Sequence, residues 1–297
     1  MRETDVLAGR FEEHRGRLKA VAYRMLGSQA ESEDAVQEAW LKLSRSDADG
    51  IENLGGWLTT VVGRICLDML RSRGARREQP IDETFVPDPV IRPLSEIDPE
   101  EEVLQADSVG LALLVVLETL EPAERLAFVL HDMFAVPFDD IAPIVERSSA
   151  ATRQLASRAR RRVKGATPSA DPDLGRQREV LDAFLAAARA GDFDALLAVL
   201  DPDVVLRADS GRLAVGPAVS KLVHGARSVA QQAMFFRQAV PAARFALVNG
   251  DIGMVNVVDG KAVSVLGVTV SGGRITHMYI LADPERMARL QVPALDH

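Results

Sequence analysis

The spacing of apolar residues divides this chain into two helical blocks and a third region with a different pattern. Between about Phe11 and Arg73, apolar positions recur every three or four residues, which predicts amphipathic helices in a compact all-α domain. A second helical block runs from about Glu101 to Val163, where Pro122 suits the first position of a helix. The recurring apolar positions of the first block include Leu18, Val21, Ala22, Met25 and Leu26.

The third region combines helices with strands. A helix is expected from Arg176 to Ala190, with Gly191 ending it and Asp192 capping a shorter helix that follows. Three dipeptides favour hairpin turns because their residues tolerate positive φ, and they separate β-rich runs such as 262–270 and 274–281. The pattern predicts an α+β domain in which helices pack on a curved antiparallel sheet. The turn dipeptides are Asn249-Gly250, Asp259-Gly260 and Gly272-Gly273.

An acidic, proline-rich segment separates the two helical blocks. Residues 79–99 hold five prolines and show no sustained apolar period, so we interpret them as a linker. We therefore expect one helical domain at 8–78, a linker at 79–104, a second helical domain at 105–165 and the α+β domain at 174–292.

Composition places the chain among globular proteins of two or three domains, since it has 297 residues of which 47% are hydrophobic and 26% charged. No stretch reaches the roughly 20 apolar residues that span a bilayer, and the first residues lack a signal-peptide layout, so we expect a cytoplasmic protein with no membrane partner. The single cysteine, Cys66, excludes an intramolecular disulfide and is more typical of a small buried hydrophobe than of a redox sensor.

Charge is segregated along the chain. The formal net charge of −8 argues against a nucleic-acid partner for an evenly charged protein. Two arginine-rich clusters, at 71–77 and 153–164, instead flank the acidic linker, and each favours a local contact with nucleic acid.

Residues 137–163 predict a helix-turn-helix, with helices at about 139–145 and 150–162. The second helix would enter a major groove, where Arg and Gln suit base edges and the basic end suits phosphates. A solvated basic face explains a lone arginine-rich helix equally well. Pro143 inside the first helix and Glu146 in the turn are unusual choices, because proline lacks an N–H and positive φ favours glycine. The expected polar face carries Thr152, Arg153, Gln154, Ser157, Arg158 and Arg161.

Two further segments lie in the first domain. Residues at three- and four-residue spacing within 32–41 share a helix face that fits docking onto a protein partner, although such a face is often only solvated. After a loop at 45–56, a helix from Trp57 to Arg73 ends in arginines. A tryptophan beside a basic helix can support an unstacked base, while a core position for Trp57 is the simpler reading. The docking face holds Asp34, Gln37, Glu38, Trp40 and Leu41.

Together these segments resemble the extracytoplasmic-function sigma factors of the sigma-70 family, over about residues 11–163. The string Asp-Ala-Val-Gln-Glu-Ala-Trp at 34–40 is similar to the family's region 2 signature. The resemblance implies that the docking face binds the β′ coiled coil of core RNA polymerase, and that the linker resembles the segment threading polymerase channels. It also implies that the 45–56 loop and the following helix melt and read the −10 promoter element, through Asn53, Trp57, Thr60, Arg64, Asp68, Arg71 and Arg73.

The helix-turn-helix is similar to region 4, which implies contacts with the −35 element through Ser149, Thr152, Arg153, Gln154, Ser157, Arg158 and Arg161. With its third region, the chain resembles the subgroup that carries a C-terminal SnoaL-like domain. That resemblance implies a tail that modulates sigma activity through an intramolecular contact with the sigma domains.

The chain departs from the subgroup's pattern at three places. A glycine-rich Asp-Gly-Gly-Gly-Lys string is replaced by Asp-Ser-Gly-Arg-Leu at 209–213, and Asn-Pro-Asp-Lys-Leu by Asp-Pro-Glu-Arg-Met at 283–287. A Trp-Leu-Pro string of the linker is represented only by Arg92-Pro-Leu, so we expect an altered contact between linker and tail. The residues assigned to the regulatory tail are Asp209, Gly211, Arg212, Asp283, Pro284 and Arg286.

An enzymatic tail is the main alternative, because SnoaL-like folds include cyclases and isomerases that move a proton with a carboxylate or histidine. The candidate groups would be Asp203, Asp209, His277 and Tyr279, although a satisfied or surface pair explains His277 and Tyr279 more simply. No nucleophile elbow, phosphate loop or histidine cluster with metal-ligand spacing is present, so we expect no catalytic, cofactor or metal site. A one-component repressor that reads DNA without polymerase is the third possibility.

Overall fold

The computed structural model describes residues 3–46, 51–76, 84–96, 109–166, 170–211, 214, 219–235 and 243–295. The chain forms two compact units, each assembled from separate stretches of sequence. The first comprises residues 1–80 and 116–166, and the second comprises 81–115 and 167–297. The described part of the expected linker therefore belongs with the tail, and the boundary at 115–116 lies inside helix α5 (Leu111–Glu118).

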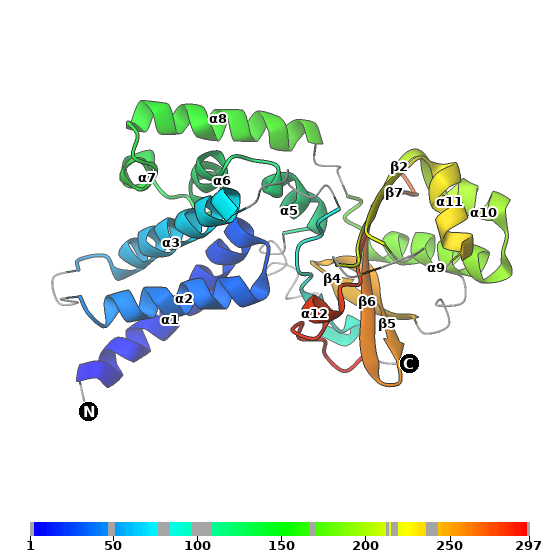
Figure 1. The fold of residues 1–297 in the computed structure, drawn as a ribbon, viewed down its shortest axis with the longest axis horizontal. Helices are drawn as coiled ribbons and strands as arrows, with labels where there is room; N and C mark the ends of the chain where they lie inside the picture. Colours follow the sequence, from blue (N-terminus) through cyan, green and yellow to red (C-terminus); the bar gives the residue numbers. More distant parts are fainter. Residues whose placement is uncertain are drawn as a thin grey trace. The chain divides into compact units, whose positions relative to one another are not determined.

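The first unit is all-helical (Figure 1). Helices α1 (Glu3–Leu26), α2 (Gln29–Leu43) and α3 (Leu54–Arg76) pack on one another through apolar positions three and four residues apart. Helix α6 (Pro122–Phe128) continues into the π-helical turn η3 (Val129–Met133), and α7 (Phe138–Val145) and α8 (Ser149–Ala166) complete the unit. Pro122 occupies the first position of α6, as expected.

The two expected helical domains pack against each other in this unit, since α3 contacts both α6 and α7. Gly63 allows the close approach, because a Cβ there would lie 3.2 Å from Cδ1 of Leu130. Arg125 is almost fully buried, with Nε donating to the Arg24 carbonyl at 3.0 Å and Nη1 pairing with Glu118 at 2.8 Å. These contacts tie α6 to α1.

The second unit is a sheet with helices packed on it (Figure 1). The sheet has seven strands in the order β1-β4-β5-β6-β7-β2-β3. The strands are β1 (Ile91–Arg92), β2 (Leu200–Asp209), β3 (Lys221–His224), β4 (Ala243–Val248), β5 (Asp251–Val258), β6 (Lys261–Ser271) and β7 (Arg274–Leu281). Its helices are α9 (Leu174–Ala190), α10 (Phe193–Val199), α11 (Ala226–Phe235) and α12 (Pro284–Met287), and η2 (Leu94–Glu96) is a short 3₁₀ turn.

Local signals in the third region are confirmed. Gly191 ends α9 at φ 72°, and the Asp192 side chain caps α10 by accepting from the Ala195 N–H at 3.0 Å. Asn249-Gly250, Asp259-Gly260 and Gly272-Gly273 all have positive φ and connect antiparallel strand pairs.

The expectation of a purely antiparallel sheet is wrong at one pair. Strand β2 runs parallel to β7, with Leu206 opposite Met278. A parallel pair needs a long crossover connection, here most of the domain, whereas turn dipeptides reveal only the strands that they join. The predicted helices on a curved sheet are otherwise confirmed.

Candidate functional site

The exposed face of α2 brings together the residues expected to dock on polymerase. Asp34, Gln37 and Glu38 are exposed, and Leu41 retains 43% of its surface although it is a large apolar side chain. Trp40 is half-buried, and its ring packs against Phe11 of α1 at 5.2 Å between centroids. Opposite this face, α2 buries Ala35, Val36, Ala39 and Leu43 in the bundle. The helix therefore presents a mixture of apolar and polar side chains at its surface, of which only Trp40 also packs on α1.

A groove of about 510 Å³ lies beside this face, between α1 and α2. Gln37 and Trp40 contribute to its wall from α2, and Phe11 and Arg15 contribute from α1. Lys19 pairs with Glu33 at 3.3 Å, so part of the polar rim is already neutralised within the protein. A concave strip next to exposed Leu41 suits an inserted helix or hairpin of a partner.

Five of the residues assigned to −10 reading follow one face of α3, since Trp57, Thr60, Arg64, Asp68 and Arg71 are spaced by three or four residues. Arg64, Asp68 and Arg71 are exposed, and Trp57 is half-buried. The Thr60 hydroxyl donates to the Gly56 carbonyl at 3.0 Å. The face therefore offers a partly covered indole followed by exposed charge.

The other two assigned residues have structural contacts. Asn53 accepts from the Gly56 N–H at 2.9 Å and so acts at the start of α3, where first-turn N–H groups lack helical partners. Arg73 pairs with Glu31 and donates to the Leu26 carbonyl. Its guanidinium is thus turned toward the bundle, which argues against the expected DNA contact. Residues 47–50 of the expected loop lie outside the described residues.

The helix-turn-helix forms as predicted, with α7 and α8 joined at Glu146 in the left-handed conformation (φ 56°). Pro143 stays within α7 and is exposed. The Ser149 hydroxyl donates to Asp139, which fixes the start of α8 against α7.

The polar residues of α8 fall into two sets. Arg153, Gln154, Ser157 and Arg161 are exposed, and the Arg153 guanidinium lies 5.6 Å from the Phe138 ring centroid. Arg158 is also exposed, yet its Nε pairs with Glu124 of α6 at 2.8 Å. Thr152 does not belong to the exposed face: it is buried, and its hydroxyl donates to the Ser148 carbonyl at 3.0 Å. The helical period alone had placed it on the polar side, and tertiary packing of α8 places it inside.

The residues assigned to the regulatory tail gather around the expected linker. Arg286 of α12 donates from Nη1 to Asp209 at 2.7 Å, from Nε to Asp88 at 2.8 Å and from Nη2 to the Val86 carbonyl at 2.6 Å. Asp209 also accepts the Val86 N–H at 3.2 Å, and its exposure is 8%, as is that of Asp88. One cation thus joins a carboxylate of β2 to a carboxylate and a carbonyl of the linker.

The remaining assigned residues shape this contact. Gly211 has φ 76°, and a Cβ there would lie 2.6 Å from Oδ2 of Asp283, so only glycine fits. Asp283 caps α12 by accepting from the Arg286 N–H at 3.2 Å, with Pro284 at the first helical position. Arg212 lies outside the described residues.

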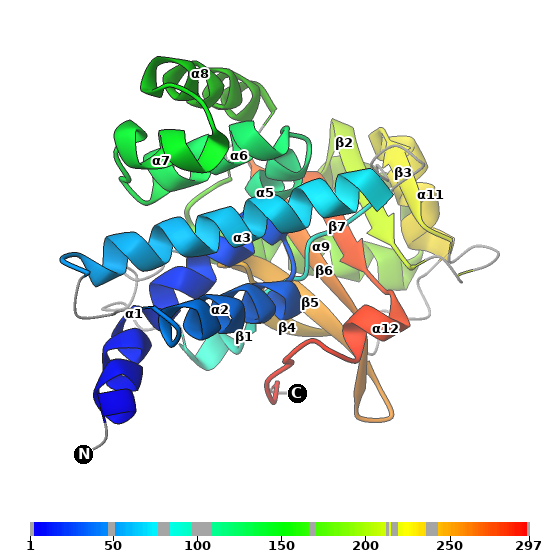
Figure 2. The same cartoon turned by 60° about the vertical axis from the view of Figure 1, so that its left-hand side comes forward.

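A second contact that the sequence analysis did not predict holds the linker at the sheet edge. Strand β1 pairs antiparallel with β4, with Ile91 opposite Val248 (Figure 2). Asn249 accepts the Val90 N–H at 2.9 Å and donates to the Val109 carbonyl at 2.8 Å, so one side chain contacts both the linker and the chain just before α5. The apolar Val86, Val90 and Ile91 were the available signal, obscured by the surrounding prolines. Arg92 extends the pairing opposite Leu247.

The groups considered for an enzymatic tail are not gathered in one place. The tail encloses a cavity of about 220 Å³, and none of Asp203, Asp209, His277 and Tyr279 lines it. His277 and Tyr279 alternate along β7 with Met278 and Ile280, which do line it, so they face the other side of the sheet. Burial lowers the pKa of His277 below its ordinary value and raises the pKa of Tyr279. The described lining contains no carboxylate and no histidine.

The described residues hold no group of three or more histidine, cysteine, aspartate or glutamate side chains arranged for a metal ion. Among the helices that the structure describes, none has the length and apolar character needed to cross a bilayer. Cys66 is buried, as expected, and burial raises the pKa of its thiol to about 12.

Comparison with known proteins places both helical blocks in one family. Residues 10–76 match the model for Sigma-70 region 2, and residues 110–163 match the model for Sigma-70, region 4. The chain is 40% identical over 290 residues to the ECF RNA polymerase sigma factor SigJ of Mycobacterium tuberculosis, covering 93% of this chain and 91% of that protein. It is 34% identical to the probable ECF RNA polymerase sigma factor SigI of the same species, covering 98% of each.

The likeness extends through the tail. The crystal structure of Mycobacterium tuberculosis SigJ superposes with a TM-score of 0.76 and 36% identity, covering 96% of this chain and 100% of that one. Sequence identity and fold therefore agree over both sigma regions and the C-terminal curved sheet. This chain belongs to the extracytoplasmic-function sigma factors of the sigma-70 family, in the form that carries a fused SnoaL-like domain.

Proposed function

We propose a separate role for each of four surfaces of this sigma factor, which directs promoter-specific transcription initiation. The α2 face binds core RNA polymerase at the β′ coiled coil, and α3 and α8 read the −10 and −35 elements. The tail modulates activity by holding the linker. Because polymerase is the partner, the protein acts in the cytoplasm.

The proposal that the protein docks on polymerase rests on the exposed face of α2. Leu41 remains 43% exposed beside Asp34 and Gln37, although a nearby groove offers apolar surface. Exposed apolar groups among polar ones mark a contact surface more often when they lie together than when they are scattered. The Trp40 ring packs against Phe11, which fixes its position on that surface. Aromatic residues held in this way often contribute most of the binding energy of an interface.

Promoter reading is supported by the α3 and α8 faces. Arg64 and Arg71 follow Trp57 along α3, which combines phosphate contacts with an aromatic surface for an unstacked base. On α8, Arg153 and Gln154 lie near the N-terminal end, the part of a recognition helix that contacts base edges. We exclude Thr152 and Arg73 from the proposed DNA contacts. The Thr152 side chain is buried in the protein, and the Arg73 side chain pairs with Glu31.

Docking is tested by assembly with core polymerase. The double variant Asp34→Ala/Gln37→Ala should weaken copurification with core polymerase at least about tenfold, as loss of a central contact does. Run-off transcription should fall in parallel while the melting temperature stays unchanged. The matched control Glu179→Ala/Gln231→Ala removes the same chemistry from exposed tail helices. Normal assembly of the first variant would count against the α2 surface.

Tail modulation is tested at Arg286. The variant Arg286→Ala leaves the 8%-exposed Asp88 and Asp209 without their shared cation, which should cost about 3–5 kcal/mol of unfolding free energy in the tail unit. We expect transcription by the full-length variant to rise, because the linker is released. Arg289→Ala, an exposed arginine of the next turn, is the control. An unchanged or lower rate would contradict restraint by the tail.

A further inference from the structure

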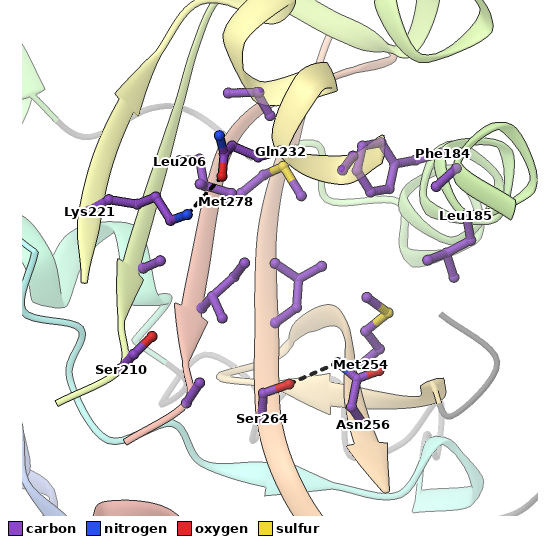
Figure 3. Close-up of a pocket in the computed structure, with 17 residues that line it drawn as sticks. Phe184, Leu185, Leu206, Ser210, Lys221, Gln232, Met254, Asn256, Ser264 and Met278 are labelled. Carbon is purple, nitrogen blue, oxygen red and sulfur yellow. Dashed lines mark hydrogen bonds between the residues drawn. The ribbon is translucent and has the colours of Figure 1, made fainter. Parts of the chain in front are cut away.

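The tail encloses a cavity that neither promoter reading nor linker binding uses. It lies between the sheet and helices α9 and α11, and its volume is about 220 Å³ (Figure 3). Leu206 and Met278 form its sheet side, and Phe184 and Leu185 approach from α9. Protein interiors are close-packed, with few voids larger than a water molecule. A cavity of this size is therefore large enough to suggest a bound molecule.

The cavity favours a small, mainly apolar molecule. Its wall is aliphatic and aromatic apart from five polar side chains. An apolar cavity of about 150 Å³ already accepts benzene, whereas sites for drug-sized ligands begin near 300 Å³. The volume here lies between these values, which suits one ring with a short chain, or a short chain alone.

The first group of polar side chains contains an unsatisfied acceptor. Asn256 of β5 donates from Nδ2 to the Ser264 hydroxyl of β6 at 2.8 Å. Its Oδ1 is buried and has no hydrogen-bond partner within the described part of the protein. A buried acceptor without a donor is costly, so a ligand hydroxyl at this place would be favourable.

The second group supplies a cation. Lys221 of β3 donates to Oε1 of Gln232 on α11 at 2.7 Å, and both side chains line the cavity (Figure 3). An ammonium has three N–H donors, so the same group can serve both Gln232 and a ligand oxygen. Burial lowers the pKa of Lys221, and an anionic oxygen beside it would stabilise the charged form.

We propose that this cavity is a binding site for a single-ring or short-chain, largely apolar molecule. Its hydroxyl donates to Asn256, and its carboxylate or carbonyl oxygen accepts from Lys221. The site binds without catalysis, since the described lining holds neither the carboxylate nor the histidine that proton transfer in such a cavity would use.

The probe 3-(4-hydroxyphenyl)propionate carries both groups on one ring, and full-length protein labelled with ¹³C at the methionine methyls reports where it binds. Met254 and Met278 line the cavity, whereas Met25 is buried in the other unit. The probe should shift the Met254 and Met278 signals, since an aromatic ring perturbs nearby methyls, and leave Met25 in place. Calorimetry on the same protein gives the Kd.

Two matched probes and two variants separate the polar contacts. Lys221→Met should weaken binding of the probe and of 3-phenylpropionate about tenfold and leave binding of 4-propylphenol unchanged, because only the first two carry a carboxylate. Asn256→Leu should weaken binding of the two phenols, the probe and 4-propylphenol, about three- to tenfold and leave binding of 3-phenylpropionate unchanged. Lys261→Met, an exposed lysine of β6, is the control. Ala233→Phe, which fills the cavity from α11, should abolish binding of all three.

Three outcomes would overturn the site. The first is the absence of both heat and methyl shifts with all three probes at millimolar concentration. The second is a shift of Met25 equal to those of Met254 and Met278. The third is unchanged Kd values in the two polar variants, which would leave an apolar void without the proposed recognition.

Discussion

Arginines on α8 differ in function according to what each one touches. Arg158 pairs with Glu124 and Arg160 with Asp132, so both hold α8 on the rest of the unit. Arg153 has no such carboxylate partner among the described contacts and lies over the Phe138 ring, where it stays exposed. Sequence alone predicted one basic face, and the positions of Glu124 and Asp132 decide which arginines remain available for DNA.

Arg153→Ala should reduce discrimination among −35 variants by roughly 1–3 kcal/mol, the value of a bidentate arginine contact with a guanine. The matched control is Arg160→Ala, which removes the same charge from a side chain that faces Asp132. Binding of the full holoenzyme to a panel of −35 sequences provides the measurement. If Arg160→Ala relaxed specificity as much as Arg153→Ala, general charge rather than base reading would explain the effect.

At the scale of elements, the linker is the largest departure from the sequence prediction. Its described residues form the edge strand β1 and the turn η2, although prolines and acidic residues indicated a segment without structure. A strand of two residues has no period to detect, and its hydrogen bonds come from Asn249 and β4, far along the chain. Local propensity carries no information about such partners.

The linker contact can be weakened without disturbing the hairpin. Asn249→Gly keeps the positive φ that the turn requires and removes both side-chain hydrogen bonds, at about 0.5–1.5 kcal/mol each. We expect the Val90 amide to exchange with deuterium about tenfold faster. Asp259→Gly, at the equivalent position of the next hairpin, is the control. Equal exchange in wild type and Asn249→Gly would show that the β1–β4 pairing holds the linker unaided.

At the scale of the whole molecule, sequence order and compact units do not coincide. Residues 81–115 fall between the two sigma regions in sequence, yet they belong to the tail unit. Val86 and Ile91 are only 1% and 7% exposed there, so removing the tail would expose them. A truncated chain thus differs from the full chain in its linker as well as in its tail. Arg286→Ala in the full chain is the cleaner test of modulation.

Limited proteolysis measures this dependence. A chain ending at Ala166 should be cut by chymotrypsin after Phe85 at least about tenfold faster than the full chain, because the Phe85–Val86 segment must leave its contacts with Arg286 and Asp209 to be cleaved. Cleavage after Trp40, inside α2, serves as the internal reference. Equal rates after Phe85 would mean that the tail does not protect the linker.

By itself, the sequence determined the elements that local periodicity and turn chemistry specify. These include the sigma-region helices, the helix-turn-helix, and three hairpins with positive φ. Tertiary structure alone decided the parallel β2–β7 pair, the burial of Thr152, the carboxylate partners of Arg158 and Arg160, and the place of the linker. The physical reason is that hydrogen bonds and ion pairs between distant residues depend on packing, which no local pattern records.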